Sequence, residues 1–349
     1  KEGSSFRLAL ASSMKKLRSL DLNRWGRAGE DVGGGVLPVE LEFRKLRYAP
    51  RVRLGGRSKL EERVVLHGVT ASFKAGTLNA LMGPSGSGKT SLLSVVAGFV
   101  DPGHVTGRML VNGRVRALPR RLVGFVFQED LMLSQLTVLE TIQVAAALKL
   151  PMSVSRELRE EAVSSLLAQL GLEHVASTLV GDAKTRGVSG GQKKRLAVAV
   201  ELVTRPSVLL MDEPTSGLDA TTALSLCTML QGLASSGYNI VCSIHQPRTN
   251  IFDLFDHLLL LSLGRMVYSG PPEGCVGFLE TVTGRSIPAR TNAADWLMDV
   301  VSEDEALGEG QRLLPDAYIK HEQGNGMTSA SSCGSLSEMN EGEEKTGGT

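Results

Sequence analysis

The sequence predicts an α/β fold in which helices cover a mainly parallel sheet. Short apolar runs typical of strands alternate along the chain with longer segments in which apolar residues recur at helical spacing. The run Val208–Met211 has four apolar residues in a row, which is typical of a strand buried on both faces. The chain has 349 residues, which suggests two domains or one large domain with appendages, and its 42% of hydrophobic residues are enough for a sizeable core.

The expected elements follow that alternation from residue 37 onward. Val39, Leu41 and Phe43 alternate with polar residues, as in a strand with one buried face. Pro151 separates two segments of helical spacing, so two helices are expected there rather than one. Further strands are expected at 64–73, 78–82, 122–127, 208–211, 239–244 and 258–263, and helices at 90–98, 139–148, 156–170, 192–203 and 220–233.

The two ends of the chain differ in composition from the middle. Residues 1–36 include a basic, Ser-rich stretch and a run of three glycines, and we interpret them as a flexible segment. The alternative is a targeting or membrane-surface helix. Residues 302–349 hold ten acidic residues against three Lys or Arg and few apolar ones, which predicts a disordered acidic linker. The folded domain is therefore expected to span residues 37–301.

The overall composition excludes several classes of protein. The chain has 38 Lys and Arg against 37 Asp and Glu, and only 4% aromatic residues, so we expect no nucleic-acid partner bound by bulk charge or by base stacking. Its four cysteines show no metal-binding spacing, which favours reduced thiols in the cytosol. The longest apolar runs are far shorter than the roughly 20 residues that span a bilayer. This chain is therefore not expected to cross a membrane.

The most specific motif is the pattern G-x-x-x-x-G-K-T at residues 83–90. Its glycines allow the backbone to curl so that successive N–H groups point at phosphate oxygens, and the helix that follows adds the positive end of its dipole. Lys89 is expected on the β- and γ-phosphates and the Thr90 hydroxyl on Mg²⁺. The alternative is a Gly-rich turn with an exposed lysine. The expected loop comprises Gly83, Pro84, Ser85, Gly86, Ser87, Gly88, Lys89, Thr90 and Ser91.

A second motif follows the apolar run Val208–Met211. Asp212 would lie at the carboxyl end of that strand, beside the phosphate loop, where an aspartate can hold Mg²⁺. Glu213 is adjacent and, not being a metal ligand, is well placed as a general base for water. Alone, this pair would be an ordinary polar strand end; with the phosphate loop it predicts a nucleotide hydrolase.

Four short segments accompany the phosphate loop and the acidic pair. Taken together and in chain order, these six motifs resemble those of the nucleotide-binding domain of ATP-binding cassette (ABC) transporters. The segment VSGGQ corresponds to the family signature, with Val188 where the family usually has Leu. Within that family, residues 136–140, 251–256 and 292–297 resemble the G subfamily, although Ala293 and Trp296 depart from its pattern. The four segments are FQED at 127–130, VSGGQ at 188–192, SGLD at 216–219 and SIHQP at 243–247.

The resemblance implies a fold and a set of roles. It implies a P-loop NTPase (RecA-like) core, an N-terminal antiparallel β subdomain and a helical subdomain inserted at about 136–191. It implies that Glu213 polarises the attacking water and that His245 contacts the γ-phosphate of ATP. Mg²⁺ would be held by Thr90, Gln128 and Asp212, with Gln128 also in the catalytic group. Tyr48 is the candidate for stacking on adenine; the alternative is a strand tyrosine packed on the surface.

The resemblance also implies partners. In the family, the signature residues serve the ATP held by a second cassette, so that two cassettes close head to tail around two ATP molecules, with Asp219 along the seam. The cassette would precede a transmembrane domain of the same full-length chain, at the cytosolic face of a membrane, and drive export of a lipophilic compound. The signature residues are Ser189, Gly190, Gly191 and Gln192.

Two other functions remain open at this point. The first is a soluble ATPase of the same superfamily that works on DNA ends or ribosomes, but such proteins carry long coiled-coil insertions or tandem cassettes, neither of which is visible here. The second is a regulatory cassette that binds ATP without turnover, against which the presence of Glu213 argues.

Overall fold

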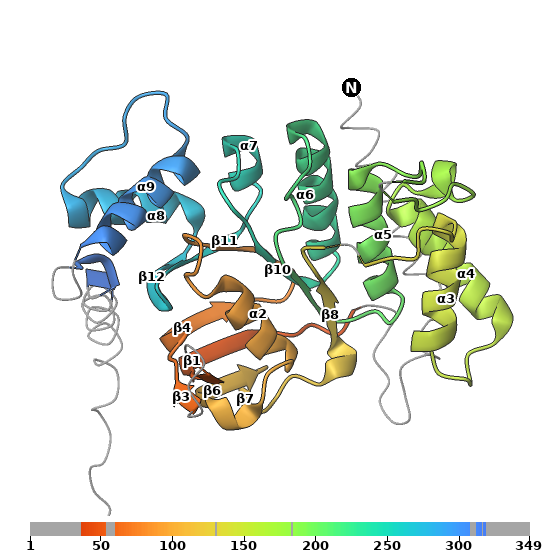
Figure 1. Ribbon diagram of the computed structural model, residues 1–349, viewed down its shortest axis with the longest axis horizontal. Helices are drawn as coiled ribbons and strands as arrows, with labels where there is room; N and C mark the ends of the chain where they lie inside the picture. The colour runs from red at the N-terminus through yellow and green to blue at the C-terminus, as the bar shows by residue number, and fades with distance from the viewer. Residues whose placement is uncertain are drawn as a thin grey trace, which may run out of the picture.

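The computed structural model describes residues 36–53, 60–129, 131–182, 184–307, 312–315 and 317–318. The expected flexible segment before residue 36 and most of the expected acidic linker lie outside the described residues. A central sheet crosses the molecule, with helices on both of its faces and helical regions at both ends (Figure 1). None of the helices in these described ranges is long and apolar enough to cross a membrane.

The central sheet has six strands in the order β12-β11-β5-β10-β9-β8. All neighbouring pairs are parallel except β11 and β12, which form an antiparallel hairpin. This confirms the expected mainly parallel sheet, and it brings the carboxyl ends of five strands to one edge. The strands are β5 (Leu78–Met82), β8 (Val123–Val126), β9 (Val208–Met211), β10 (Asn239–Ser243), β11 (His257–Ser262) and β12 (Arg265–Gly270).

The two faces of this sheet are packed against different layers. Along β5, Leu78 and Met82 contribute to one hydrophobic core, with helices α5 and α6, whereas Leu81 contributes to the other, with helix α2 and the antiparallel strands. Side chains of a strand alternate between faces, so a strand buried on both faces must be apolar throughout. The helices on these faces are α2 (Lys89–Ala97), α5 (Gly190–Leu202), α6 (Ala220–Ala234) and the short α7 (Thr249–Phe252).

An antiparallel sheet covers α2 from the other side, in the order β4-β1-β6-β7. Its inner residues Leu41, Phe43 and Phe73 are at most 1% exposed and pack into the same core as α2. This confirms the expected N-terminal antiparallel β region. Its strands are β1 (Leu41–Tyr48), β4 (Leu66–Phe73), β6 (Val105–Val111) and β7 (Arg114–Val115), and a separate hairpin joins β2 (Arg51–Arg53) and β3 (Leu60–Glu62).

The helices α3 (Val138–Lys149) and α4 (Arg156–Gln169) form the right-hand end of the molecule in Figure 1 and pack on α5, which in turn contacts β8; they fall within the residues expected for the inserted helical subdomain. Thr137 begins α3 with a capping box, because its hydroxyl accepts the N–H of Glu140 while the Glu140 carboxylate accepts the N–H of Thr137. Short 3₁₀ turns complete the connections: η2 (Pro102–His104), η3 (Arg120–Leu122) and η4 (Glu173–Val175).

The C-terminal region corrects the expected boundary at residue 302. Helices α8 (Pro272–Thr283) and α9 (Ala293–Ala306) follow β12, so α9 continues past the point where a disordered linker was expected. The reason is burial: Val301 is fully buried, and the Asp304 carboxylate accepts the N–H of Leu313 at 2.9 Å. Tyr318 is also buried, and its hydroxyl donates to the carbonyl of Ser269 on β12 at 2.7 Å. The described residues beyond 302 therefore still pack on the domain.

His257, at the start of β11, makes the stability of the fold depend on pH. Burial beside Phe73, helped by repulsion from Lys74, lowers the pKa of His257 from 6.5 to about 4. Above pH 6.5 the residue is neutral in both states; between pH 6.5 and 4 only the unfolded chain takes up the proton, so stability falls as pH falls. The free energy of unfolding, measured in urea, should fall between pH 7.5 and pH 4.5. We expect this fall to be smaller in His257→Gln than in the unmodified chain by on the order of 2 kcal/mol. The unmodified chain keeps the full sensitivity to acid, and an equal loss of stability in the variant and the unmodified chain between these two pH values would contradict the assignment.

Candidate active site

The phosphate loop joins β5 to α2 in a conformation that requires glycine. Gly83, Gly86 and Gly88 have φ angles of 150°, 83° and 98°, all in the region that side chains rarely adopt. A Cβ on Gly83 would lie 2.2 Å from the carbonyl oxygen of Leu261, so the loop also lies too close to β11 for any side chain at this position. The local sequence therefore determines both the turn and its close contact with the sheet.

Lys89, the first residue of α2, is folded back over this loop. Its ammonium donates to the carbonyl oxygens of Gly83 at 2.8 Å and Pro84 at 2.9 Å, and the residue is only 7% exposed. Burial lowers the pKa of Lys89, and the carboxylates of Glu213 and Asp212 oppose that shift. The alternative of an exposed lysine on an ordinary turn is thus wrong: the cation is buried beside two acids.

Two features of the loop suit an anion. The buried Ser87 hydroxyl has no hydrogen-bond partner among the described residues. Helix α2 begins at Gly88 without a side-chain cap, so its first N–H groups lack the partner that a capping residue would supply. Unpaired donors at a helix N-terminus bind phosphate groups well. Thr90, in the first turn, is exposed next to them.

The acidic pair is held at the carboxyl end of β9. Asp212 is 7% exposed, and its Oδ1 accepts the hydroxyl of Ser243 at 2.5 Å. The backbone N–H of Glu213 donates to the same Ser243 oxygen at 2.8 Å. Ser243 begins the SIHQP segment, but the sequence assigns it no role of its own; its position at the end of β10, which pairs in parallel with β9, places it beside the acids. Ser243 therefore orients both acids.

Gln128 completes this group from the end of β8. Its side-chain amide donates to Oε2 of Glu213 at 2.9 Å. The buried ammonium of Lys194, on α5, donates in turn to the carbonyl oxygen of Gln128 at 3.0 Å. The structure thus brings together Lys89, Asp212, Glu213 and Gln128, as expected, and adds Lys194 as a link to the helix of the signature motif.

The two remaining predicted residues, His245 and Tyr48, follow or end strands of the two sheets. His245 is exposed just beyond β10, where the preceding Ile244 N–H donates to the carbonyl of Leu81 at 3.0 Å. Tyr48, at the end of β1, is half-buried, and its carbonyl accepts the N–H of Val65 at 2.8 Å. The stacking of Tyr48 on adenine and the contact of His245 with a phosphate stay predictions.

The signature residues form a second, separate group at the start of α5. Ser189 and Gln192 form a capping box, in which the hydroxyl of Ser189 accepts the Gln192 N–H and Oε1 of Gln192 accepts the Ser189 N–H. Gly191 packs against α6, because a Cβ there would lie 2.1 Å from Cγ2 of Thr222. Asp219 caps α6 and accepts the Thr222 hydroxyl at 2.6 Å, the main reason that its pKa is lowered. The N-terminus of α5 therefore packs directly against Thr222, the residue to which Asp219 is bonded.

A buried lysine on a glycine loop, two acids at the carboxyl end of β9 and a glutamine that bonds to one of them define a P-loop ATPase. The comparisons name the family. Residues 66–216 match the family model described as ABC transporter. CbiO1 of Clostridium perfringens, part of the ABC transporter complex cbiONQ, has a similar fold, with a TM-score of 0.56 and 24% sequence identity over 70% of this chain and 93% of that chain.

The sequence relatives place the domain within that family. ABC transporter G family member 7 of Arabidopsis thaliana is 43% identical over 80% of this chain and 39% of its own length. The broad substrate specificity ATP-binding cassette transporter ABCG2 of Sus scrofa is 36% identical over 86% of this chain and 46% of its own length. The chain spans less than half the length of the curated relatives that it matches. It carries the ATP-binding domain of an ABC transporter of the G family.

Proposed function

We propose that this ATPase domain drives transport of a lipophilic compound across a membrane, in the direction of export, by closing head to tail with a second cassette around two Mg-ATP. The observation that supports the proposal is the separation of two complete groups: Lys89 with its acids, and Ser189 with its helix. Each group suits one side of a triphosphate. Two copies placed head to tail would bring the Lys89 group of one chain to the Ser189 group of the other.

The residues present fit a magnesium ion beside the triphosphate. Thr90, Gln128 and Asp212 offer a hydroxyl, an amide oxygen and a carboxylate, which are the hard oxygen donors that Mg²⁺ prefers. A bound Mg²⁺ would neutralise charge on the phosphates during transfer. The Asp212 carboxylate is already oriented by Ser243, so it needs little rearrangement to serve as a ligand.

Glu213 is the residue proposed to take the proton from water. Its backbone is fixed by Ser243 and its carboxylate by the Gln128 amide, so its orientation is set before the nucleotide arrives. His245, exposed at the next strand end, would donate a hydrogen bond to the charge that develops on the phosphate. The combination supports turnover rather than ATP binding alone.

The signature group is proposed to act on the nucleotide of the partner cassette. The N-terminus of α5 presents N–H groups and the Ser189 hydroxyl, and the positive end of the helix dipole favours an anion there. The buried Lys194 ties this helix to the backbone of Gln128. A shift of α5 on dimer closure would therefore reach the residue that holds Glu213.

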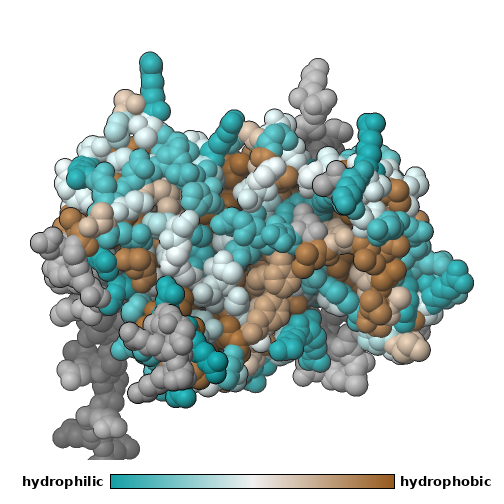
Figure 2. Space-filling view, viewed as in Figure 1, coloured by the Kyte–Doolittle hydropathy of each residue, from teal (hydrophilic) through white to brown (hydrophobic). Residues whose placement is uncertain are grey.

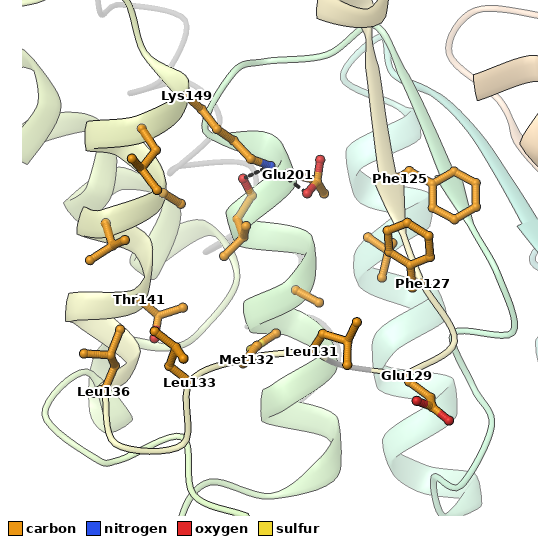
Figure 3. A pocket seen from close by; sticks show the side chains of 16 residues that line it. Phe125, Phe127, Glu129, Leu131, Met132, Leu133, Leu136, Thr141, Lys149 and Glu201 are labelled. Atoms are coloured by element: carbon orange, nitrogen blue, oxygen red, sulfur yellow. Dashed lines mark hydrogen bonds and ion pairs between the residues drawn. The ribbon is translucent and has the colours of Figure 1, made fainter. Parts of the chain in front are cut away.

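The transmembrane partner is proposed to dock in an apolar groove between β8 and α3. The groove has a volume of about 300 Å³, and Figure 3 shows its side chains converging from β8, the segment that follows it, α3 and α5. Leu131 and Leu148 are 86% and 81% exposed on its rim, and Figure 2 shows the same region as the brown area on the right of the molecule. Exposed apolar side chains around a groove are typical of a protein interface. Gln128 directly precedes this segment, so occupation of the groove would be felt at the catalytic group.

The experiment that tests this function is ATP-dependent uptake into inside-out membrane vesicles that carry the full-length protein. With a fluorescent lipophilic compound as probe, we expect accumulation that needs both ATP and magnesium. The Glu213→Gln protein at equal abundance should give none. Full ATP hydrolysis without any uptake of several chemically different probes would contradict the transport role while leaving the ATPase intact.

A further inference from the structure

The phosphate loop rests on the turn between β11 and β12. Leu263 and Gly264, the two residues of this turn, have φ angles of 44° and 75°, as in a two-residue hairpin turn of type I′. The N–H of Gly264 donates to the carbonyl of Ser87 at 3.0 Å, and its own carbonyl accepts the N–H of His67 at 2.8 Å. A Cβ on Gly264 would lie 2.0 Å from the carbonyl oxygen of Val65. The turn thus lies between β4 and the phosphate loop and is bonded to both, so a shift of the turn would move the backbone of the phosphate loop at Ser87.

Helix α9 holds the base of this turn. The hydroxyl of Ser262, the last residue of β11, donates to Oε1 of Glu305 at 2.9 Å. Ser262 is 1% exposed and Glu305 is half-buried, so the bond is largely protected from water. Leu297 and Val301 on the same helix are fully buried, which fixes the helix on the core. Glu305 is therefore presented to Ser262 by a rigid element.

We propose that Glu305 is a positioning residue for ATP binding: through Ser262 it fixes the β11–β12 turn, and through that turn it fixes the phosphate loop. The chain beyond α9 returns to the same hairpin, where Tyr318 bonds to Ser269. Tyr318 thus contacts the hairpin on its other strand, β12. This role lies outside the motifs that identify the family.

The test uses the 349-residue chain with four substitutions: Ser262→Ala, Glu305→Ala, Glu305→Gln and, as control, Glu303→Ala. Glu303 lies on the same helix but is exposed and pairs with Arg285. ATP affinity is measured by titration with a fluorescent ATP analogue and Mg²⁺, beside KM, kcat and the melting temperature. We expect Ser262→Ala and Glu305→Ala to weaken binding by about 3- to 10-fold, with kcat little changed. Glu305→Gln, whose amide oxygen still accepts the hydroxyl, should recover most of the affinity.

The double variant Ser262→Ala/Glu305→Ala should bind ATP no more weakly than the worse single variant, because both remove the same bond. Additive losses, or wild-type affinity in both single variants, would overturn the proposal, as would an equal loss in Glu303→Ala. If Glu305→Ala fails to fold, the comparison of Ser262→Ala with Glu305→Gln tests the proposal instead. Only Ser262→Ala should bind the ATP analogue clearly more weakly than the unmodified chain, and equal affinities of the two variants would overturn the assignment. A change in melting temperature alone, without a change in affinity, would show a structural role and also contradict it.

Discussion

Glu213→Gln should lower steady-state ATP hydrolysis by about 100- to 10,000-fold, the range that a general base contributes, while ATP still binds. Glutamine has the shape of glutamate, its backbone N–H can still donate to Ser243, and its side-chain oxygen can still accept from the Gln128 amide. The substitution therefore removes proton acceptance and little else. The measurement is phosphate release at saturating ATP, together with the affinity for a fluorescent ATP analogue.

Glu160→Gln is the matched control for that variant, because it removes an exposed carboxylate that pairs with Arg156 on α4, away from the site. Its hydrolysis rate should equal that of the unmodified chain. A Glu213→Gln protein that binds ATP and hydrolyses it at the unmodified rate would show that another group accepts the proton.

Lys89→Met should abolish tight ATP binding, with a loss of affinity of at least about 10- to 100-fold, the equivalent of one or more charge-assisted hydrogen bonds. Methionine retains most of the buried stem but removes the ammonium that donates to Gly83 and Pro84. It also leaves the carboxylates of Asp212 and Glu213 without their nearby cation, so they repel the triphosphate. Hydrolysis should fall at least in proportion.

The control for Lys89→Met is Lys74→Met, which removes an exposed lysine after β4. Equilibrium titration with the same analogue distinguishes the two: Lys74→Met should bind as the unmodified chain does. Unchanged affinity in Lys89→Met, with its folding confirmed by the melting curve, would mean that the loop backbone alone holds the phosphates.

The sequence predicts best those elements in which burial of the element's own side chains produces a clear pattern of apolar residues. Val208–Met211 is a strand with the expected bounds, because four consecutive buried apolar residues suit only a central strand. Strand β6 was not expected, because three of its seven residues are exposed in a row and no alternation is visible. Helix α9 passes the expected boundary at residue 302 because Asp304 is paired with a backbone group nine residues further on. Such pairing is invisible in a local pattern.

The same distinction holds for the site. Residues 83–90 are contiguous, so the motif itself predicts the loop, and parallel strand ends bring Asp212, Glu213 and Gln128 to one edge. The residues that orient them come from distant segments: Ser243 bonds to Asp212 across 31 positions, and Lys194 to Gln128 across 66. Ser262 and Glu305 are 43 positions apart. Contacts of this kind depend on how elements pack, which a single sequence does not encode in any short pattern.

The central claim is that two chains enclose each nucleotide, so that catalysis requires a pair. The most direct test follows phosphate release per mole of protein over a dilution series at saturating Mg-ATP. The account predicts that the rate per molecule rises with protein concentration and falls towards zero at high dilution, because two separate chains must meet before either can hydrolyse ATP. A rate per molecule that stays constant at every dilution would show that one chain suffices, and would contradict the account.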